Sequence, residues 1–202
     1  MSYNGWGRHE NGDVAVDEIL DAAGRAFAVH GVAKATMIDV CRYAGCSRAT
    51  LYRYFDNRTM LHSAYVNRAA LRIAERMGDA TPATGPAPVV IAERILYGIR
   101  SVRNDPLLAV WFTPENMAVP IALSRDSEVL AALTAGFTDG LDGVPRGSED
   151  TQRQGRWLLR SIVSLLAMPT DDPDEERFLV ENYIVPALLA EPAGPADERT
   201  RT

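Results

Sequence analysis

Apolar residues recur along this chain at the spacing of α-helices and almost nowhere at the two-residue spacing of strands. In the clearest case they occupy positions i, i+3, i+4, i+7 and i+11 of one face, which are Val16, Ile19, Leu20, Ala23 and Phe27. This pattern predicts an amphipathic helix that ends at Gly31, since glycine readily takes a left-handed conformation. Because helical spacing returns throughout the chain, we expect an all-α fold.

Proline- and glycine-containing segments divide the rest of the chain into further predicted helices. A long helix is expected from Thr59 to Met77, and the segment GDATPATGPAP at 78–88 then interrupts helical structure. Beyond it, helices are predicted over 89–103, 106–112, 115 to about 140, 149–168 and 174–190. Because proline removes a helical hydrogen bond, Pro120 should bend or interrupt the third of these, and Pro186 should kink the last.

The stretch from Thr36 to Leu61 predicts two short helices joined by a glycine turn. Thr36 stands at an N-cap position, and Asp39 follows at the spacing of a capping box. Gly45 can take positive φ at the end of the first helix, and Ser47 can cap the second. The local pattern is that of a helix-turn-helix.

The second short helix has an apolar face and faces suited to DNA. Leu51 and Phe55 lie four residues apart and should point inward, which leaves the basic and hydrogen-bonding residues on other faces. Such a helix fits the major groove, where Arg53 could reach guanine O6 and N7 or a phosphate. Double-stranded DNA is therefore the predicted partner.

The run from about residue 14 to 65 resembles the DNA-binding domain of TetR/AcrR-family transcriptional regulators. The matching pieces, in order, are Phe27, His30-Gly31, Thr36, Ala44 to Ser47, Thr50 to Phe55 and Asn57-Arg58 leading to Leu61. Two positions depart from the family pattern: Ile38 replaces a basic or polar residue, and Cys41 replaces the usual alanine. The resemblance implies an N-terminal three-helix DNA-binding domain and a C-terminal helical domain for ligand binding and dimerisation.

The resemblance also implies which residues contact DNA. These are Thr36, Arg48, Ala49, Thr50, Tyr52, Arg53, Tyr54 and Arg58. Thr36 would cap its helix and touch a phosphate, residues 48–50 would face base edges, and both tyrosines and Arg58 would hold the DNA backbone. Arg53 is the further predicted base contact, with a phosphate contact as the alternative. The tyrosines could instead pack on neighbouring helices, and the arginines could form an ordinary solvated face.

Charge is distributed unevenly along the chain. The net charge is -6, yet residues 30–70 hold six basic side chains against Asp39 and Asp56, a local net charge of +4. The basic residues are Lys34, Arg42, Arg48, Arg53, Arg58 and Arg68. A basic surface facing phosphates, with an acidic remainder held away from them, suits a DNA-binding protein; chance clustering on a surface helix is the alternative.

Patterns typical of catalysis and metal binding do not stand out. Glu115, Asp126, Glu128, His30 and His62 form no triad, carboxylate pair or metal-ligand spacing, so neither an enzyme nor a cofactor is predicted. Cys41 and Cys46 lack zinc-site spacing and are interpreted as small buried residues, with redox sensing as the alternative.

The predicted organisation is a flexible arm at 1–12, the DNA-binding domain at 13–58, a helical domain at 59–190 and a disordered tail at 191–202. No stretch approaches eighteen uncharged apolar residues, and the N-terminus lacks the pattern of a secretory signal. We therefore expect no membrane partner and a cytoplasmic location.

Two groups of apolar residues in the second domain carry functional predictions. Aromatic, methionine and other apolar residues predict an apolar effector pocket. They are Tyr97, Trp111, Phe112, Met117, Ile121, Phe137 and Met168. Simple core packing of these residues is the alternative. By resemblance, the last two helices would form a four-helix bundle with their copies in a homodimer, through Leu158, Ile162, Leu165, Leu166, Phe178, Tyr183 and Leu188.

The function that follows is a homodimeric transcriptional regulator, predicted to be a repressor of a partly palindromic operator. An unknown small-molecule effector in the body would shift the spacing of the two DNA-binding heads. The competing hypothesis is an α-helical adaptor that binds protein and no longer binds DNA.

Overall fold

The computed structural model describes residues 11–138, 141 and 148–190, in which the regular elements are all helices and no strand occurs. The predicted all-α fold is confirmed. The predicted tail and residues 1–10 of the predicted arm lie outside the described residues. The first helix begins at Asn11, within the last two residues of the arm predicted at 1–12.

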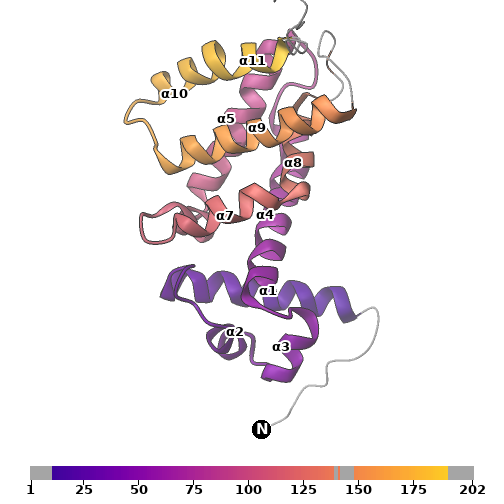
Figure 1. The fold of residues 1–202 in the computed structure, drawn as a ribbon, viewed down its shortest axis with the longest axis vertical. Coiled ribbons are helices and arrows are strands. Elements are labelled where there is room, and N and C mark those ends of the chain that lie inside the picture. Colours follow the sequence, from indigo (N-terminus) through magenta and orange to yellow (C-terminus); the bar gives the residue numbers. More distant parts are fainter. Residues whose placement is uncertain (1–10, 139–140, 142–147, 191–202) are drawn as a thin grey trace, which may run out of the picture.

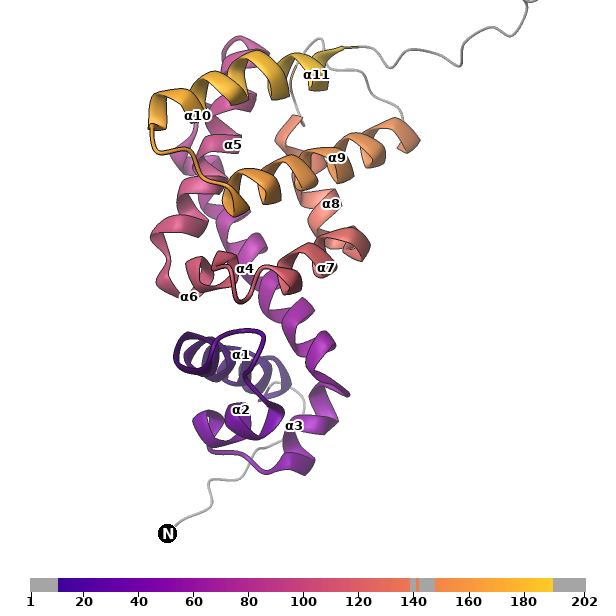
Figure 2. The ribbon, with the colours of Figure 1, turned by 60° about the vertical axis from the view of Figure 1, so that its left-hand side comes forward.

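The N-terminal part of the chain forms a compact group of helices at one end of an elongated molecule (Figures 1 and 2). Its helices are α1 (Asn11–His30), α2 (Met37–Ala44) and α3 (Arg48–Tyr54), which we call the head. The predicted apolar face of α1 is buried except at Val16, which is half-buried, and Phe27 and Leu51 are fully enclosed. Helical periodicity alone located this core.

A single long helix, α4 (Arg58–Ala80), runs from the head into the rest of the molecule, which we call the body. Asn57 caps it by accepting a hydrogen bond from the backbone N–H of Met60 at 2.9 Å. The predicted domain boundary at residue 58 therefore coincides with the first residue of α4. The single helix α4 therefore connects the head to the body.

The body consists of helices that follow α4 along the chain. They are α5 (Ala87–Asn104), α6 (Pro106–Ala109), the 3₁₀ turn η1 (Val110–Phe112), α7 (Ala118–Asp126), α8 (Glu128–Ala135), the 3₁₀ turn η2 (Gly136–Thr138), α9 (Ser148–Ala167), α10 (Pro173–Leu179), the π-helical segment η3 (Val180–Ile184) and α11 (Val185–Leu189). Both views place α10 and α11 at the end of the body far from the head, with α9 crossing the body next to them (Figures 1 and 2). No described helix combines the length and the apolarity that crossing a bilayer requires.

The prediction of one helix from 115 to about 140 was wrong. The chain breaks at Ser127, whose hydroxyl caps α8 by accepting from the N–H of Leu130 at 3.2 Å. Pro120 does not interrupt α7, because it lies in the first turn, where a backbone N–H needs no helical partner.

The prediction of an irregularity at Pro186 was correct. The preceding residues are π-helical, and the N–H of Val185 bonds to the carbonyl of Val180, five residues back. Pro186 has no N–H to donate, and its ring would crowd the carbonyl of Asn182 in a regular helix. The wider turn relieves that crowding.

Ion pairs fix the last helices on the body. Arg103 of α5 binds the buried carboxylate of Glu176 at 2.6 Å and the carbonyl of Leu165 at 2.9 Å. Arg177 binds Glu93 of α5 at 2.7 Å. These contacts join α9 and α10 to α5, so the far end of the body is held in one arrangement.

Candidate DNA-binding and ligand-binding sites

The turn before α2 is fixed by a complete capping box. The Thr36 hydroxyl accepts from the N–H of Asp39 at 3.2 Å, and the Asp39 carboxylate accepts from the Thr36 N–H at 3.0 Å. Hydrogen bonds from the side chain and backbone of Thr36 lower the pKa of Asp39 below its ordinary value. Thr36 therefore caps the helix as predicted, and it remains exposed.

The turn between α2 and α3 closes through its backbone. Gly45 has φ 64°, and the N–H of Cys46 bonds to the carbonyl of Cys41 at 3.2 Å. Ser47 then caps α3 by accepting from the N–H of Thr50 at 3.1 Å, and the two hydroxyls lie 2.9 Å apart. The start of α3 is thus held firmly against α2.

The outward face of α3 carries Arg48, Ala49, Tyr52 and Arg53, all exposed. The guanidinium of Arg48 lies 5.9 Å from the ring centre of Tyr52. The guanidinium of Arg53 lies 5.0 Å from the ring centre of Tyr54 and donates a hydrogen bond to the Tyr54 hydroxyl at 3.2 Å. Each arginine is partly ordered by an aromatic ring. The helix presents two cations to any partner that it meets.

Arg58 has a structural contact that the sequence did not reveal. Its Nη1 donates to the carbonyls of Ala33 at 3.0 Å and Ala35 at 3.4 Å. These carbonyls belong to the loop between α1 and α2, immediately before Thr36. Arg58 therefore links the start of α4 to that loop, and its predicted grip on the DNA backbone stays a prediction.

The positive charge that this region can offer to DNA is smaller than the net charge of +4 counted over residues 30–70. Arg68 binds Asp17 at 2.8 Å and Asp21 at 2.7 Å, and its side chain is largely covered. These carboxylates lie on α1, outside the interval over which the charge was counted. Counting Arg68 among the cations facing DNA was therefore wrong.

The two cysteines flank the turn of the helix-turn-helix. Cys41 is buried and Cys46 half-buried. Burial, together with the neighbouring Cys41, raises the pKa of the Cys46 thiol above its ordinary value of 9.0. A protonated thiol is a poor nucleophile, so the environment favours packing over redox sensing.

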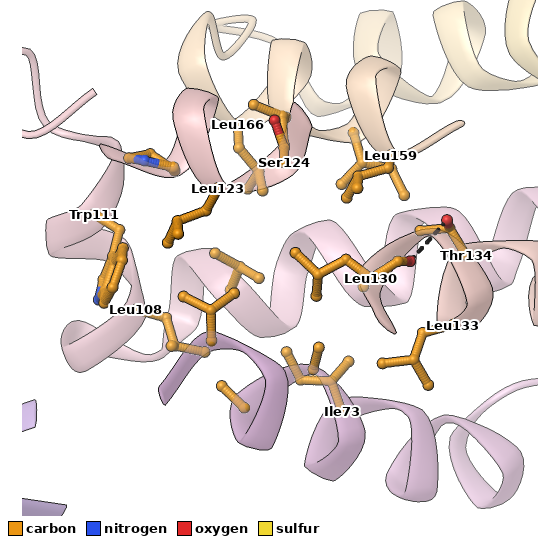
Figure 3. A pocket seen from close by; sticks show the side chains of 18 of the residues that line it. Ile73, Leu108, Trp111, Leu123, Ser124, Leu130, Leu133, Thr134, Leu159 and Leu166 are labelled. Atoms are coloured by element: carbon orange, nitrogen blue, oxygen red, sulfur yellow. Dashed lines mark hydrogen bonds between the residues drawn. The ribbon is translucent and has the colours of Figure 1, made fainter. Parts of the chain in front are cut away.

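A cavity of about 140 Å³ lies within the body, between α4, α5, α7, α8 and α9 (Figure 3). Its wall is apolar, with Ile73, Leu108, Leu123, Leu130 and Leu159 among the lining residues. Two hydroxyl residues, Ser124 and Thr134, also line it. A preformed apolar cavity of this kind is where a small ligand would be expected to bind.

Comparison with known proteins places these features in a family. Residues 19–65 match the model described as "Bacterial regulatory proteins, tetR family". The uncharacterised HTH-type transcriptional regulator Rv1255c of Mycobacterium tuberculosis is 38% identical over 193 residues, which cover 93% of this chain and 92% of that protein. This chain belongs to the TetR family. It is a DNA-binding transcriptional regulator of the helix-turn-helix type and not an enzyme.

Two further relatives extend the likeness. The HTH-type transcriptional regulator AlkX of M. tuberculosis is 32% identical over 168 residues, covering 77% of this chain and 76% of AlkX. The crystal structure of the TetR family repressor AlkX from a Dietzia strain matches with a TM-score of 0.57 at 23% identity, covering 92% of this chain and 97% of that one. The structural match shows that both chains share a fold.

Only some of the residues predicted to form the effector pocket line the cavity of the body. Trp111, Phe112 and Phe137 line it. Tyr97, Met117, Ile121 and Met168, which the sequence also placed in an effector pocket, do not line this cavity. Met168 is 70% exposed beyond the end of α9, and Ile121 is 45% exposed on the outer side of α7. Residue type identified apolar side chains without showing which way each one faces.

An aromatic cluster joins the cavity to the head. Trp111 lines the cavity, and its ring also stacks on Tyr65, with centroids 5.6 Å apart and planes 7° apart. Phe27 of α1 and His62 of α4 both meet the Trp111 ring edge to face at 5.4 Å. Burial lowers the pKa of His62 to about 4, with the charge of Arg58 as a lesser cause, so this histidine is neutral at pH 7.

Asn116 forms a second link between body and head, which sequence reasoning missed. Its Oδ1 accepts from the N–H of Ala33 at 2.9 Å, and its Nδ2 donates to the carbonyl of Val110 at 2.8 Å and the hydroxyl of Thr113 at 3.1 Å. Ala33 is also the residue whose carbonyl Arg58 binds. A single asparagine in a loop carries no periodic signal, so the sequence could not single it out.

The predicted dimer residues fall into two groups. Leu158, Ile162, Leu166 and Leu188 are buried within the single chain, and Ile162 and Leu166 line the cavity. Leu165 is half-buried. Phe178 and Tyr183 are 54% and 64% exposed, and their ring centroids lie 6.1 Å apart. These two rings remain available to a partner.

Proposed function

We propose that this chain is a homodimeric repressor that binds a partly palindromic operator and is released by a small apolar ligand in the body cavity. The observation that carries the proposal is the position of Trp111, which belongs both to the cavity wall and to the aromatic cluster that holds the head. A ligand in the cavity would therefore contact a side chain on which the position of α1 depends. The target DNA implies work in the cytoplasm.

DNA would be bound mainly through α3. Its exposed face would enter the major groove, with Arg48, Ala49, Thr50 and Arg53 toward base edges, and Thr36, Tyr52, Tyr54 and Arg58 toward phosphates. The caps at Thr36 and Ser47 support this proposal because they fix the orientation of α3 before it meets DNA. A preorganised helix loses less conformational entropy on binding.

Dimerisation would use the end of the body far from the head. Trp157 of α9, Phe178 of α10 and Tyr183 of η3 are large apolar side chains left exposed there. A two-fold pairing through this surface would present two α3 helices to successive major grooves, which suits a palindromic site. The proposal places dimerisation on these three side chains rather than on the buried leucines.

Release would be a shift between two populations of the dimer. In one arrangement the two heads fit adjacent major grooves, and in the other they do not. A ligand that binds the second arrangement more tightly lowers operator affinity, at most by the ratio of its own affinities for the two arrangements. Trp111 and Asn116 are the contacts through which that preference would reach the head. The apolar cavity and the likeness to a repressor implicated in biodegradation of n-alkanes both support an apolar effector.

Selection of bound fragments from sheared DNA of the source organism tests the DNA-binding half of the proposal. We expect a two-fold-symmetric site to be enriched at near-physiological salt, with affinity falling steeply as salt rises through counterion release. Absence of any enriched site, from a protein shown to be a folded dimer, would favour the adaptor that binds protein instead of DNA. Ligand addition to the selected complex then tests release.

A further inference from the structure

The two hydroxyl residues of the cavity wall have no hydrogen left to donate to a ligand. None of the residues that line it in the described part of the chain carries a charge. The Ser124 hydroxyl donates to the carbonyl of Ile121 at 2.9 Å, and the Thr134 hydroxyl lies 2.7 Å from the carbonyl of Gly155. Both hydroxyl hydrogens are therefore engaged within the protein.

Trp111 is the remaining lining residue with a polar atom. Its Nε1 is buried and has no hydrogen-bond partner in the described part of the chain. In Figure 3 this nitrogen lies on the edge of the indole turned away from the other labelled lining residues. The cavity thus meets the carbon face of the ring.

Burying a polar ligand here would carry a large cost in free energy. An ionised carboxylate can only accept hydrogen bonds, so it would lose its hydration without gaining a donor or a cation. A ligand hydroxyl could use only the spare acceptor capacity of Ser124 or Thr134. A hydrocarbon has no polar group to desolvate, and its transfer from water into the cavity is favourable in free energy. The chemistry of the wall therefore selects against polar ligands as well as for apolar ones.

The volume limits the size of the ligand. The cavity holds about 140 Å³, and a protein cavity of about 150 Å³ lined by aliphatic and aromatic residues binds benzene. A ligand of about six carbons fills such a space without forcing the helices apart. A larger molecule would have to displace the packed residues around it, which strains a core.

We propose that the effector is an uncharged hydrocarbon close to benzene in size, recognised by shape and burial alone, and that carboxylic acids of the same length are excluded. The inference rests on the proposed function, in which this cavity is the effector site. It adds the chemical class of the ligand and the reason for the class.

Binding is measured first on the full-length protein without DNA, as the shift in the midpoint of thermal unfolding with benzene, hexane, hexan-1-ol and sodium hexanoate at pH 7. We expect benzene and hexane to raise the midpoint. Hexan-1-ol should stabilise less than hexane, and hexanoate should leave the midpoint unchanged. Equal stabilisation by hexanoate and hexane would overturn the inference.

A matched pair of variants locates the binding. Ala69→Leu adds three carbons to a lining position of α4, whereas Ala80→Leu makes the same change at an exposed position at the end of that helix. We expect hexane to lose its effect on Ala69→Leu and keep it on Ala80→Leu. Hexane binding that survives in both variants would place the ligand elsewhere and contradict the inference.

The same probes separate this inference from the proposed release. If hexane binds the cavity and operator affinity is unchanged, the ligand class stands and release by ligand fails. If hexanoate both binds and lowers operator affinity, release stands and the hydrocarbon class fails. If no probe binds, the inference is lost, and the fragment selection still decides DNA binding by itself.

Discussion

His62 shows how a single buried side chain can make the stability of this protein depend on pH. Its pKa is about 4 in the folded chain and 6.5 in its ordinary state. Between these values the unfolded chain binds more protons, so the free energy of unfolding should fall as pH falls from 6.5 toward 4, by up to about 3 kcal/mol. The loss is complete once both states are protonated.

The variant His62→Phe tests this expectation. Phenylalanine fits the aromatic environment formed by Phe27 and Trp111 and has no titrating group. Urea unfolding of both proteins between pH 7 and pH 4 should show a flatter stability profile for the variant. Parallel profiles would mean that other groups cause the pH dependence.

Arg58 and Arg48 form a matched pair for the DNA contacts. Arg58→Ala removes the hydrogen bonds to the loop before Thr36, so it should lower the free energy of unfolding by about 1 kcal/mol and weaken binding to all DNA sequences alike. Arg48→Ala removes only a contact with an exposed ring, so stability should hardly change. Unfolding in urea, with DNA titrations at several salt concentrations, measures both effects.

Arg53 should behave differently from Arg58 if it reads a base. Arg53→Ala is expected to change which bases are preferred at one position of the site, while the salt dependence hardly changes. Competition between matched and singly substituted sites measures this preference. A uniform loss on all sites would assign Arg53 to a phosphate, the alternative that the sequence left open.

Among the helices, α8 and α9 approach each other closely at Gly155. A Cβ there would lie 2.3 Å from the backbone carbonyl oxygen of Ala131 and 3.0 Å from the Cβ of Ala135. Thr134 adds its hydrogen bond to the Gly155 carbonyl at the same place. This helix pair forms part of the cavity wall, so its spacing sets the width of the cavity.

Gly155→Ala should therefore destabilise the protein by about 1–3 kcal/mol, because the helices must move apart. Gly78→Ala is the control, since it lies on α4 with open space around it. That change should be neutral or stabilise by up to about 1 kcal/mol through helix propensity. Thermal unfolding measures both, and equal effects would show that α8 and α9 adjust without strain.

In the whole molecule, an aromatic cluster and Asn116 are among the contacts that join the head to the body. Asn116→Ala leaves the N–H of Ala33 without its partner and frees the loop before α2 from the body. We expect the ratio of operator affinities without and with effector to move toward one, while operator binding itself persists. The control Thr113→Ala removes a contact of Asn116 but keeps the bond to Ala33, so its ratio should change less.

Measuring operator affinity at saturating and zero effector for both variants decides this point. Coupling is a difference between two binding free energies, so a general loss of stability does not imitate it. An unchanged ratio in Asn116→Ala would leave Trp111 and its cluster as the route between cavity and head.

Most of the helices, the capped helix-turn-helix and the resemblance to the TetR family could be predicted from the sequence alone. These follow from local rules: apolar spacing marks a helical face, Thr36 and Ser47 cap the helices that follow them, and Gly45 turns the chain. The tertiary structure alone decided what each face meets. It turned Leu158 and Leu188 inward instead of toward a partner, and paired Arg68 with α1. Periodicity shows that a face is apolar, but the packing of distant segments decides whether it meets the core, a cavity or a partner.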